Sequence, residues 1–366
     1  MKLITEARVL NALLKRLGLA ILPGATNPII TNILVSAGDN KATFIATDLN
    51  ITIQYTIECI TEGEATQMLI PFSTLSKLSA LEEGPVTIEL QEEKVYMKGN
   101  SDVFCLGSPG KPAEFPKVPK VADDKFMAAP EGLMYAMGVA SPGVSKDETK
   151  PAMMCVCLEV MKSGINVVST DGHSLYLNEF AGAYEVEKVE ELLVPASAAK
   201  ALDGFDAAKI GFNNRHAAFV AGPVTVFTKR SDNKYPAYRG VLPVHEANVT
   251  VKLDDLMQAL NKALIVAADL NNNAVTLAFG GEQLELKASS GELNANCAMQ
   301  ADTSKSPIDG IVLNGRILKR VLTMMDAHRD DTADLAISVR AKNKAITVKL
   351  NGRESITVLA MPIVLN

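Results

Sequence analysis

Amphipathic helix patterns alternate with strand patterns along the whole chain. The first clear helix pattern predicts a helix over residues 5–19, because apolar side chains fall on one face at a 3.6-residue spacing: Val9, Leu10, Leu13, Leu14 and Leu17. Alternating apolar positions then predict strands at residues 33–36, 43–45, 51–57 and 67–70. A second helix follows over 73–81 and a hairpin over 86–98. Residues 1–120 therefore read as two helices on antiparallel sheet.

The same order of elements recurs twice more. Helices are predicted around 133–137, 196–202, 254–266 and 314–325. Strands are predicted at residues 155–160, 165–169, 249–253, 274–279, 284–288, 335–339 and 345–350, with a hairpin turn at 213–214. Proline-rich stretches at 108–119 and 235–243 end the first and second copies. Helices on one side of antiparallel sheet predict an α+β fold.

Short motifs anchor this repeat. Three of them each predict a strand end followed by a helix, at spacings of 124 and 118 residues: Ile70-Pro71-Phe72-Ser73, Val194-Pro195-Ala196-Ser197 and Val312-Leu313-Asn314-Gly315. A second motif, Ala46-Thr47-Asp48-Leu49, returns 123 residues later as Ser169-Thr170-Asp171-Gly172, with a degenerate third copy near Ser289-Ser290-Gly291. A long-period repeat decides architecture, so we predict three similar domains at 1–120, 121–245 and 246–366.

Composition narrows the functional classes. Of 366 residues, 48% are hydrophobic and 21% charged, and no apolar run reaches the length of a membrane span. The five cysteines and four histidines lack metal-ligand spacing, and no dinucleotide fingerprint is present. Cys155 and Cys157 share a strand face and read as buried free thiols. We predict a cytoplasmic protein with no metal, no cofactor and no membrane contact.

One segment resembles a hydrolase site. Residues Ser169 to Ser174 contain serine, aspartate and histidine within six positions. Triad members normally come from separate elements. In addition, Thr47-Asp48 holds the same place in the first copy, and no histidine follows it there. The Thr-Asp pair therefore reads as structural, and a Ser/His/Asp hydrolase around His173 is the weaker alternative.

Basic side chains are better organised than the catalytic candidates. The helix at 314–325 places Arg316, Lys319 and Arg320 on one face, and its apolar residues lie opposite. Other predicted helices contribute basic residues at Arg8, Lys15, Lys77, Lys200 and Lys262. A net charge of −6 does not exclude a local positive surface, so these helix faces predict sequence-independent contact with phosphates. A solvated helix face is the alternative for each pattern taken singly.

The last residues are almost wholly apolar. Pro362 interrupts this run, so the residues beyond it are expected to leave the sheet and expose apolar side chains. An ordinary core strand is the alternative. An exposed apolar patch at a terminus predicts a docking groove for a partner.

Taken together, these residues resemble the bacterial DNA polymerase III β subunit, the sliding clamp, over essentially the whole chain. The resemblance is carried by the two Thr-Asp motifs and by three further stretches: Glu148-Thr149-Lys150-Pro151, Tyr235-Pro236-Ala237-Tyr238-Arg239-Gly240-Val241-Leu242-Pro243 and Met361-Pro362-Ile363. It implies a non-catalytic processivity factor, built as a head-to-tail homodimeric ring of three-domain chains around double-stranded DNA. The implied partners are the DNA polymerase III catalytic subunit, the clamp loader and other proteins with short peptide motifs.

The resemblance also assigns residues. The implied peptide groove is formed by Met153, Thr170, Gly172, His173, Ser174, Leu175, Pro243, Asn314, Val358, Met361, Pro362 and Ile363. Lys150 joins the helix residues as a DNA-facing candidate, and Phe104 and Leu106 are expected to meet Val266 and Ala267 at the dimer interface.

Some positions depart from the family pattern. Ser174 and Val364 stand where many relatives carry basic residues, Met154-Cys155 replaces a common Asn-Gly, and the loop at 23–27 lacks an arginine. Because Val266 and Ala267 are small, we hypothesise a weak ring interface. A ring or scaffold that binds proteins without encircling DNA is a second alternative.

Overall fold

The structure is a computed structural model that describes residues 1–366 except 108–109, 206–207, 243–245, 268–271, 331–332 and 364–366. It forms two compact units. Unit 1 comprises residues 1–138 and 194–232, and unit 2 comprises 139–193 and 233–366.

Unit 1 contains two antiparallel sheets with helices against them. Its helices are α1 (Ala7–Leu17), α2 (Phe72–Ser79), α4 (Ala196–Leu202) and most of α3 (Leu133–Ala140). One sheet has the order β5-β1-β7-β8-β9, from β1 (Lys2–Glu6), β5 (Ile60–Glu62), β7 (Pro85–Gln91), β8 (Lys94–Gly99) and β9 (Asp102–Gly107). The other has the order β10-β15-β16-β17-β4-β3-β2-β6, from β2 (Asn32–Gly38), β3 (Lys41–Thr47), β4 (Ile51–Glu58), β6 (Thr66–Pro71), β10 (Phe126–Ala128), β15 (Ala208–Phe212), β16 (His216–Ala221) and β17 (Val224–Lys229).

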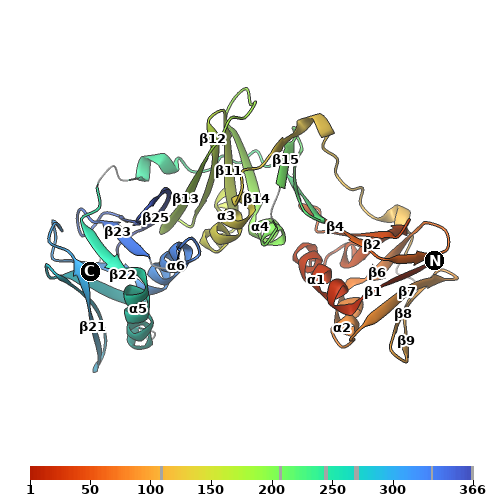
Figure 1. Cartoon of the computed structure of the whole chain (residues 1–366), viewed down its shortest axis with the longest axis horizontal. Coiled ribbons are helices and arrows are strands. Elements are labelled where there is room, and N and C mark those ends of the chain that lie inside the picture. Colours follow the sequence, from red (N-terminus) through yellow and green to blue (C-terminus); the bar gives the residue numbers. More distant parts are fainter. Residues whose placement is uncertain (108–109, 206–207, 243–245, 268–271, 331–332, 364–366) are drawn as a thin grey trace. The chain divides into compact units, whose positions relative to one another are not determined.

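Unit 2 is built on one long sheet of twelve strands. Its order is β14-β11-β12-β13-β25-β24-β23-β18-β21-β20-β19-β22. The first half holds β11 (Cys155–Met161), β12 (Gly164–Thr170), β13 (Ser174–Ala181), β14 (Glu190–Pro195, which crosses the unit boundary) and β25 (Arg353–Ala360). The second half holds β18 (Val249–Lys252), β19 (Ala274–Phe279), β20 (Gln283–Ser290), β21 (Leu293–Asp302), β22 (Gly310–Asn314), β23 (Asp334–Ser338) and β24 (Ile346–Leu350). Helices α5 (Leu253–Ala267) and α6 (Gly315–Asp326) cover it and contact each other (Figure 1).

The helices form where their apolar positions can be buried. On α1 the face predicted from the sequence is the buried one, with Leu10, Leu13 and Leu17 fully enclosed. On α6, Leu318, Val321 and Leu322 are buried while Arg316 and Lys319 are exposed. The α6 N-terminus is capped by Asn314, whose side-chain oxygen accepts from the backbone N–H groups of Arg316 and Ile317.

The repeated motifs fall at repeated structures. Each strand-to-helix motif lies where a strand ends and a helix begins, at β6–α2, β14–α4 and β22–α6. The α+β fold and two helices per copy are therefore confirmed, and most predicted bounds agree within a few residues. The sequence patterns missed several strands, among them β5, β10, β13 and β17.

The two units divide the predicted second domain. Strand β17 of that segment pairs with β4, and strand β13 pairs with β25, so each half of the segment extends a different sheet. The three-domain boundaries stay a prediction.

Candidate functional site

The turn between β12 and β13 is built by its own side chains. Thr170 Oγ1 donates to the Ser174 carbonyl at 2.7 Å and accepts from Gly172 N at 3.1 Å. Asp171 Oδ1 accepts from the backbone N–H groups of His173 at 2.9 Å and Ser174 at 2.8 Å. Gly172 has φ of +89°, a conformation that suits glycine. These bonds fix the turn and leave the His173 side chain exposed.

A half-buried ion pair ties this turn to α6. The Arg320 guanidinium contacts Asp171 Oδ2 and donates to Ser174 Oγ at 2.6 Å, while Ser174 Oγ donates to Asp171 Oδ1 at 3.2 Å. Side-chain exposure is 17% for Asp171 and 24% for Arg320. Burial opposes ionisation of Asp171, but the hydrogen bonds from Arg320 and the turn N–H groups outweigh it and lower its pKa. Asp171 and Ser174 thus both bind the Arg320 guanidinium, an arrangement unlike a catalytic triad.

The chain end lies beside this turn. Strand β25 pairs with β13 in the register Leu175↔Leu359, and Met361 N donates to the His173 carbonyl at 2.8 Å. Beyond it, Pro362 bridges to Leu313 and Ile363 N donates to Val312 O at 2.9 Å. The chain thus leaves β25 after Ala360, as Pro362 predicted, and Met361 is 42% exposed.

We call this arrangement the unit-2 junction: the β13–β25 pairing, the Thr170–Ser174 turn and the segment Met361–Ile363. An apolar cluster underlies it. Its members are Ala152, Cys157, Val168, Leu175, Leu177, Leu193, Tyr235, Tyr238 and Leu359, with Cys155 and Leu242 packed against them. Cys155 and Cys157 therefore do share one apolar face, and burial raises the pKa of Cys155 to about 11.

The structure brings most, but not all, of the predicted groove residues together at this junction. Met153 lies in the 3₁₀ helix Pro151–Met154 and close to Gly172. Val358 pairs with Tyr176 and is completely buried, whereas Asn314 is occupied in capping α6. Pro243 lies outside the described residues.

A carboxylate that the sequence patterns did not single out holds the segment before Pro243. Glu159 is buried and accepts from Tyr238 Oη at 2.7 Å and Asn166 Nδ2 at 3.2 Å, and it contacts the Arg239 guanidinium. Burial disfavours its charge, but the bonds from Arg239 and Tyr238 lower its pKa. This network positions the Tyr235–Leu242 segment over the apolar cluster. Tyr238 and Arg239 lie 79 and 80 residues after Glu159 in sequence, so no local pattern predicts their contacts with it.

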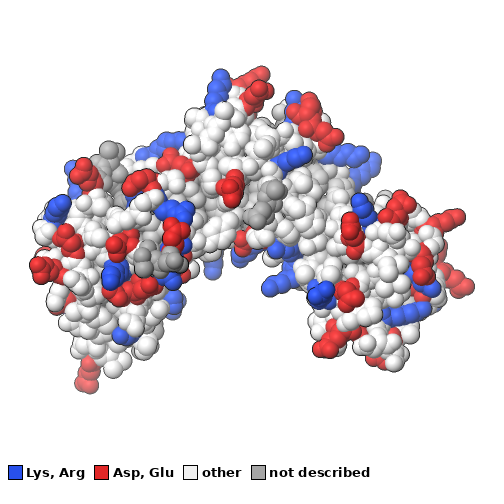
Figure 2. All heavy atoms as spheres, viewed as in Figure 1, with Lys and Arg blue, Asp and Glu red and all other residues white. Residues whose placement is uncertain are grey.

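The predicted cationic residues are exposed with one exception. Arg8 and Lys15 on α1, Lys77 on α2, Lys200 on α4 and Lys262 on α5 all face solvent. Lysine and arginine spheres lie beside α1 and α4 in unit 1 (Figure 2). Lys150 is exposed and lies 3.6 Å from Asp147. Arg320 is the exception, because its guanidinium turns toward Asp171.

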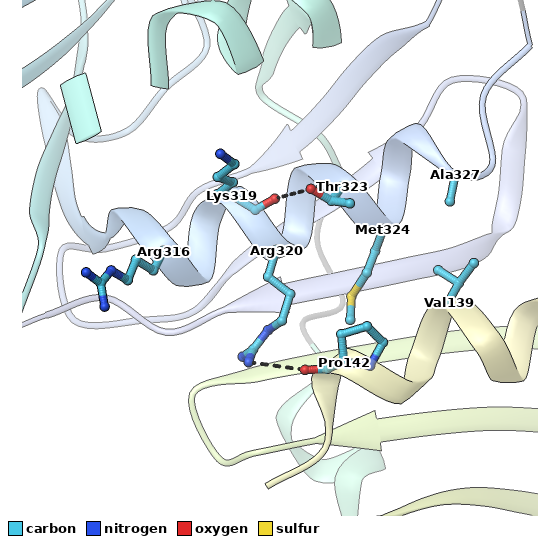
Figure 3. Close-up of a pocket in the computed structure, with 8 residues that line it drawn as sticks. All are labelled: Val139, Pro142, Arg316, Lys319, Arg320, Thr323, Met324 and Ala327. Carbon is cyan, nitrogen blue, oxygen red and sulfur yellow. Dashed lines mark hydrogen bonds between the residues drawn. The ribbon is translucent and has the colours of Figure 1, made fainter. Parts of the chain in front are cut away.

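Helix α6 also borders a cavity of about 340 Å³ in unit 2. Val139 and Pro142 lie across from Arg316, Lys319, Arg320, Thr323, Met324 and Ala327 (Figure 3). Arg320 points across it toward the Pro142 carbonyl, at 3.5 Å, and Met324 points to the same side. Apolar and cationic side chains both line the cavity.

The predicted interface residues differ in exposure. Phe104 on β9 and Val266 on α5 are partly exposed, whereas Leu106 and Ala267 are already buried within one chain. Their neighbours Val103, 60% exposed, and Ile265, 77% exposed, present more apolar surface and were not among the residues named from the sequence. An apolar residue that is exposed at a helix end or on an edge strand is a candidate contact residue, and this is the signal that points to both.

Other site classes find no support among the described residues. They contain no group of three or more His, Cys, Asp or Glu side chains arranged to hold a metal. No described helix combines the length and apolar character needed to cross a membrane. His173 is the histidine of the hydrolase alternative. Among the described residues, its hydrogen bond to Asp171 comes from its backbone N–H and not from its imidazole.

Known proteins resemble this chain along its whole length. Residues 1–119 match the family described as DNA polymerase III beta subunit, N-terminal domain. The beta sliding clamp of Staphylococcus aureus is 24% identical over 365 residues, which cover 94% of each chain, and that of Staphylococcus epidermidis is 24% identical over 362 residues.

Solved structures share the fold. The DNA polymerase sliding clamp of Bacillus subtilis aligns with a TM-score of 0.85 and 20% identity, covering 100% of both chains. The sliding clamp of Bartonella birtlesii bound to griselimycin aligns with a TM-score of 0.87 and 18% identity, also over 100% of both chains. The resemblance indicated by the sequence motifs is confirmed.

Proposed function

We propose that this chain, a member of the DNA polymerase III β subunit family, is a sliding clamp that serves as a processivity factor in DNA replication. It encircles duplex DNA as a homodimeric ring and tethers the replicative polymerase, without catalytic activity of its own. The observation that carries the proposal is similarity over the full length to named beta sliding clamps, in both sequence and fold. The internal repeat supports it, because three copies in each of two chains supply six similar sectors for a ring.

Such a clamp works by topology. A closed ring cannot leave DNA sideways, and a polymerase bound to it is held at a high effective concentration near the primer end. Sliding requires weak phosphate contacts that do not read bases. The exposed helix residues Arg8, Lys15, Lys77, Lys200, Lys262, Arg316 and Lys319 suit this role, with Lys150 as a further candidate. Because Arg320 is paired with Asp171, we assign it to positioning the turn.

Ring closure needs free surfaces at both ends of the chain. Strand β9 is the last strand of its sheet, and in the part of the chain that the structure describes, residues 293–299 of β21 pair on one side only. Edge strands of this kind can pair with another chain. We propose that three clamp domains, 1–120, 121–245 and 246–366, form each half of the ring, with Phe104, Leu106, Val266 and Ala267 near the contact and Val103 and Ile265 at its surface.

The unit-2 junction is the proposed docking groove for the polymerase, the clamp loader and other partners. Exposed Met361 above the apolar cluster offers a hydrophobic anchor site, and His173, Gly172 and Met153 border it. Two similar sliding clamps have been solved bound to griselimycin, which provides a ready probe for this groove. A replication clamp works on the chromosome, so we place the protein in the bacterial cytoplasm.

Topological retention on DNA is the decisive test. The protein is loaded onto a nicked circular duplex by a clamp loader with ATP and then passed through a gel-filtration column. We expect it to elute with the circle, and to be lost when a restriction enzyme linearises the DNA. A protein that stays on linear DNA, or never elutes with the circle, is not a sliding clamp, and the second result favours the scaffold that does not encircle DNA.

The groove is tested separately by calorimetric titration of griselimycin. The His173→Ala variant should bind it several-fold more weakly, because one groove wall is shortened. The hydrolase alternative instead expects unchanged griselimycin binding and loss of a hydrolytic activity in the same variant.

The ring interface has its own measurement. Ala267 and Leu106 are buried within one chain, so few apolar side chains remain for the partner, and we expect a dimer that dissociates at low concentration. Analytical ultracentrifugation over a dilution series measures this. A dimer that persists unchanged at nanomolar concentration contradicts the weak-interface hypothesis.

A further inference from the structure

Unit 1 contains a second junction built on the backbone plan of the unit-2 junction. Strand β17 pairs with β4 in the register Phe227↔Thr52, where β25 pairs with β13 as Leu359↔Leu175. Lys229 N donates to the Asn50 carbonyl at 2.8 Å, which matches the bond from Met361 N to the His173 carbonyl. Lys229 therefore occupies the position of Met361. We call this place, made of the β4–β17 pairing, the Thr47–Ile51 turn and Lys229, the unit-1 junction.

The layer beneath the two junctions also corresponds. The unit-1 cluster of Leu34, Ile45, Leu69 and Phe115 matches Cys157, Val168, Leu193 and Tyr238 of unit 2, at offsets of 123, 123, 124 and 123 residues. The cluster in unit 2 continues upward through Leu175 and Leu177. The corresponding residues of unit 1 are Thr52 and Gln54, which are polar. Unit 1 thus has the equivalent buried cluster but lacks the apolar floor that Leu175 and Leu177 form above it in unit 2.

Cationic groups lie beside the unit-1 junction. A cavity of about 460 Å³ is lined by Lys120, Asn213, Asn214, Arg215 and His216. Lys229 lies opposite His216 in the β16–β17 register, and the Arg230 backbone N–H donates to the Arg215 carbonyl at 2.8 Å. Lys120, Arg215 and Lys229 are exposed, and the described residues show no ion pair for any of the three.

The cationic groups are held in a fixed frame. Asn213 Oδ1 accepts from Arg215 N at 2.8 Å and His216 N at 2.9 Å, and Asn213 Nδ2 donates to the Lys120 carbonyl at 3.1 Å. One side chain therefore links the β15–β16 turn to the segment before β10. The nearby carboxylate Asp48 is engaged through Oδ1 with the N–H groups of Asn50 and Ile51, at 2.8 Å each. Asp232 is the other acidic side chain close to Lys229 in sequence.

We propose that the unit-1 junction is a second docking site, which binds an extended acidic segment of a partner protein. Charge complementarity favours an aspartate- and glutamate-rich segment, since Lys120 and Arg215 line the cavity and Lys229 lies opposite His216, another of its lining residues. The plan shared with the unit-2 junction favours an extended peptide. Single-stranded nucleic acid is less suited, because it binds best where aromatic rings offer stacking platforms, and no aromatic side chain other than the His216 imidazole lines this cavity. This inference goes beyond clamp function and does not depend on DNA encirclement.

Fluorescence anisotropy of a labelled polyglutamate peptide of about ten residues tests the site on the full chain at low salt. The double variant Arg215→Glu with Lys229→Glu should weaken binding by at least about tenfold. A matched control, Lys41→Glu with Lys94→Glu, changes the same charge on exposed lysines elsewhere in unit 1 and should leave the affinity unchanged. Binding should also move the His216 imidazole resonance and fall as salt is added.

Three results overturn the proposal: polyglutamate fails to bind, the control variant loses as much affinity as the junction variant, or an oligothymidylate of similar length binds more tightly and displaces the peptide. If the double glutamate variant is misfolded by circular dichroism, Arg215→Gln with Lys229→Gln decides the question. DNA retention and griselimycin binding are measured on every variant, and they should not change. Loss of retention in the wild-type chain would count against the clamp, whereas loss of polyglutamate binding counts against this site alone.

Discussion

The two junctions share a backbone and differ in side chains. Their turns carry the same bonds: Thr47 and Thr170 each donate to the carbonyl four residues ahead, and Asp48 and Asp171 each accept two backbone N–H groups. Above the turns, Met361 and an apolar floor in unit 2 stand where Lys229 and polar residues stand in unit 1. The repeat therefore keeps the backbone bonds of the turn and changes the side chains around it.

A second difference is the support behind each turn. Asp171 faces Arg320 of α6, whereas Asp48 makes no ion pair with any described residue and is bonded to its own turn. The unit-2 turn is braced from behind, and the unit-1 turn is held by its own bonds. A rigid turn suits a groove wall, because less ordering is required when a ligand binds.

Replacing the aspartate of each turn should give the largest difference in stability between the two junctions. We expect Asp171→Ala to lower the free energy of unfolding by about 2–3 kcal/mol, because it leaves the half-buried Arg320 unpaired. Asp48→Ala removes turn bonds alone and should lower it by about 1 kcal/mol. Urea denaturation followed by circular dichroism measures both. Equal losses in the two variants would show that Arg320 adds nothing, and Arg320→Ala in a double-mutant cycle with Asp171→Ala isolates the pair.

Exchanging the residue at the top of each junction changes what the junction binds. Met361→Lys gives unit 2 the cation of unit 1, and we expect griselimycin affinity to fall roughly tenfold or more, which is about 1.4 kcal/mol, through loss of an apolar anchor. The reciprocal change Lys229→Met should leave griselimycin binding intact and weaken polyglutamate binding. If Met361→Lys binds griselimycin as tightly as the parent chain, Met361 is not part of the groove.

Acid should weaken the braced turn. The pKa of Asp171 is lowered in the folded state, so its contribution to stability is full above the ordinary aspartate pKa and is lost as the pH falls through the lowered value. Glu159, whose pKa is also lowered, adds a loss in the same direction. We expect Asp171→Asn to be less stable at neutral pH and to lose less stability on acidification. Parallel pH profiles for the two proteins would contradict the assignment.

The smallest effect concerns the third turn position. Leu49 has φ of +75° where Gly172 has +89°, and a side chain is strained there. Leu49→Gly should change stability little, by at most about 1 kcal/mol in the favourable direction, and Gly172→Leu should cost about 1 kcal/mol. Gly172→Leu also brings a side chain toward Met153, so griselimycin binding should weaken as well. Thermal melting curves, with Gly24→Leu as a control in open space at φ of +74°, measure the strain.

The sequence determined the repeat, the helices and the structural role of the Thr-Asp motifs. These are local features: a 3.6-residue apolar period, a strand-to-helix motif and a turn whose side chains bond to their own backbone. Pro362 likewise predicted where the last strand ends, since proline cannot donate to the ladder. The motifs at 46–49 and 169–172 could be matched because the same local geometry requires the same residues.

Tertiary structure alone decided what each copy carries. The pairing of Asp171 with Arg320 joins residues 149 apart, and the Glu159–Arg239 pair joins residues 80 apart, so neither leaves a local pattern. The sequence could place Arg320 on a cationic helix face, but only packing of α6 beside the β12–β13 turn directs its charge inward. The sheets that join β17 to β4 and β13 to β25 place Lys229 and Met361 at matching positions. Long-range pairing, which no periodicity encodes, therefore separates the two junctions.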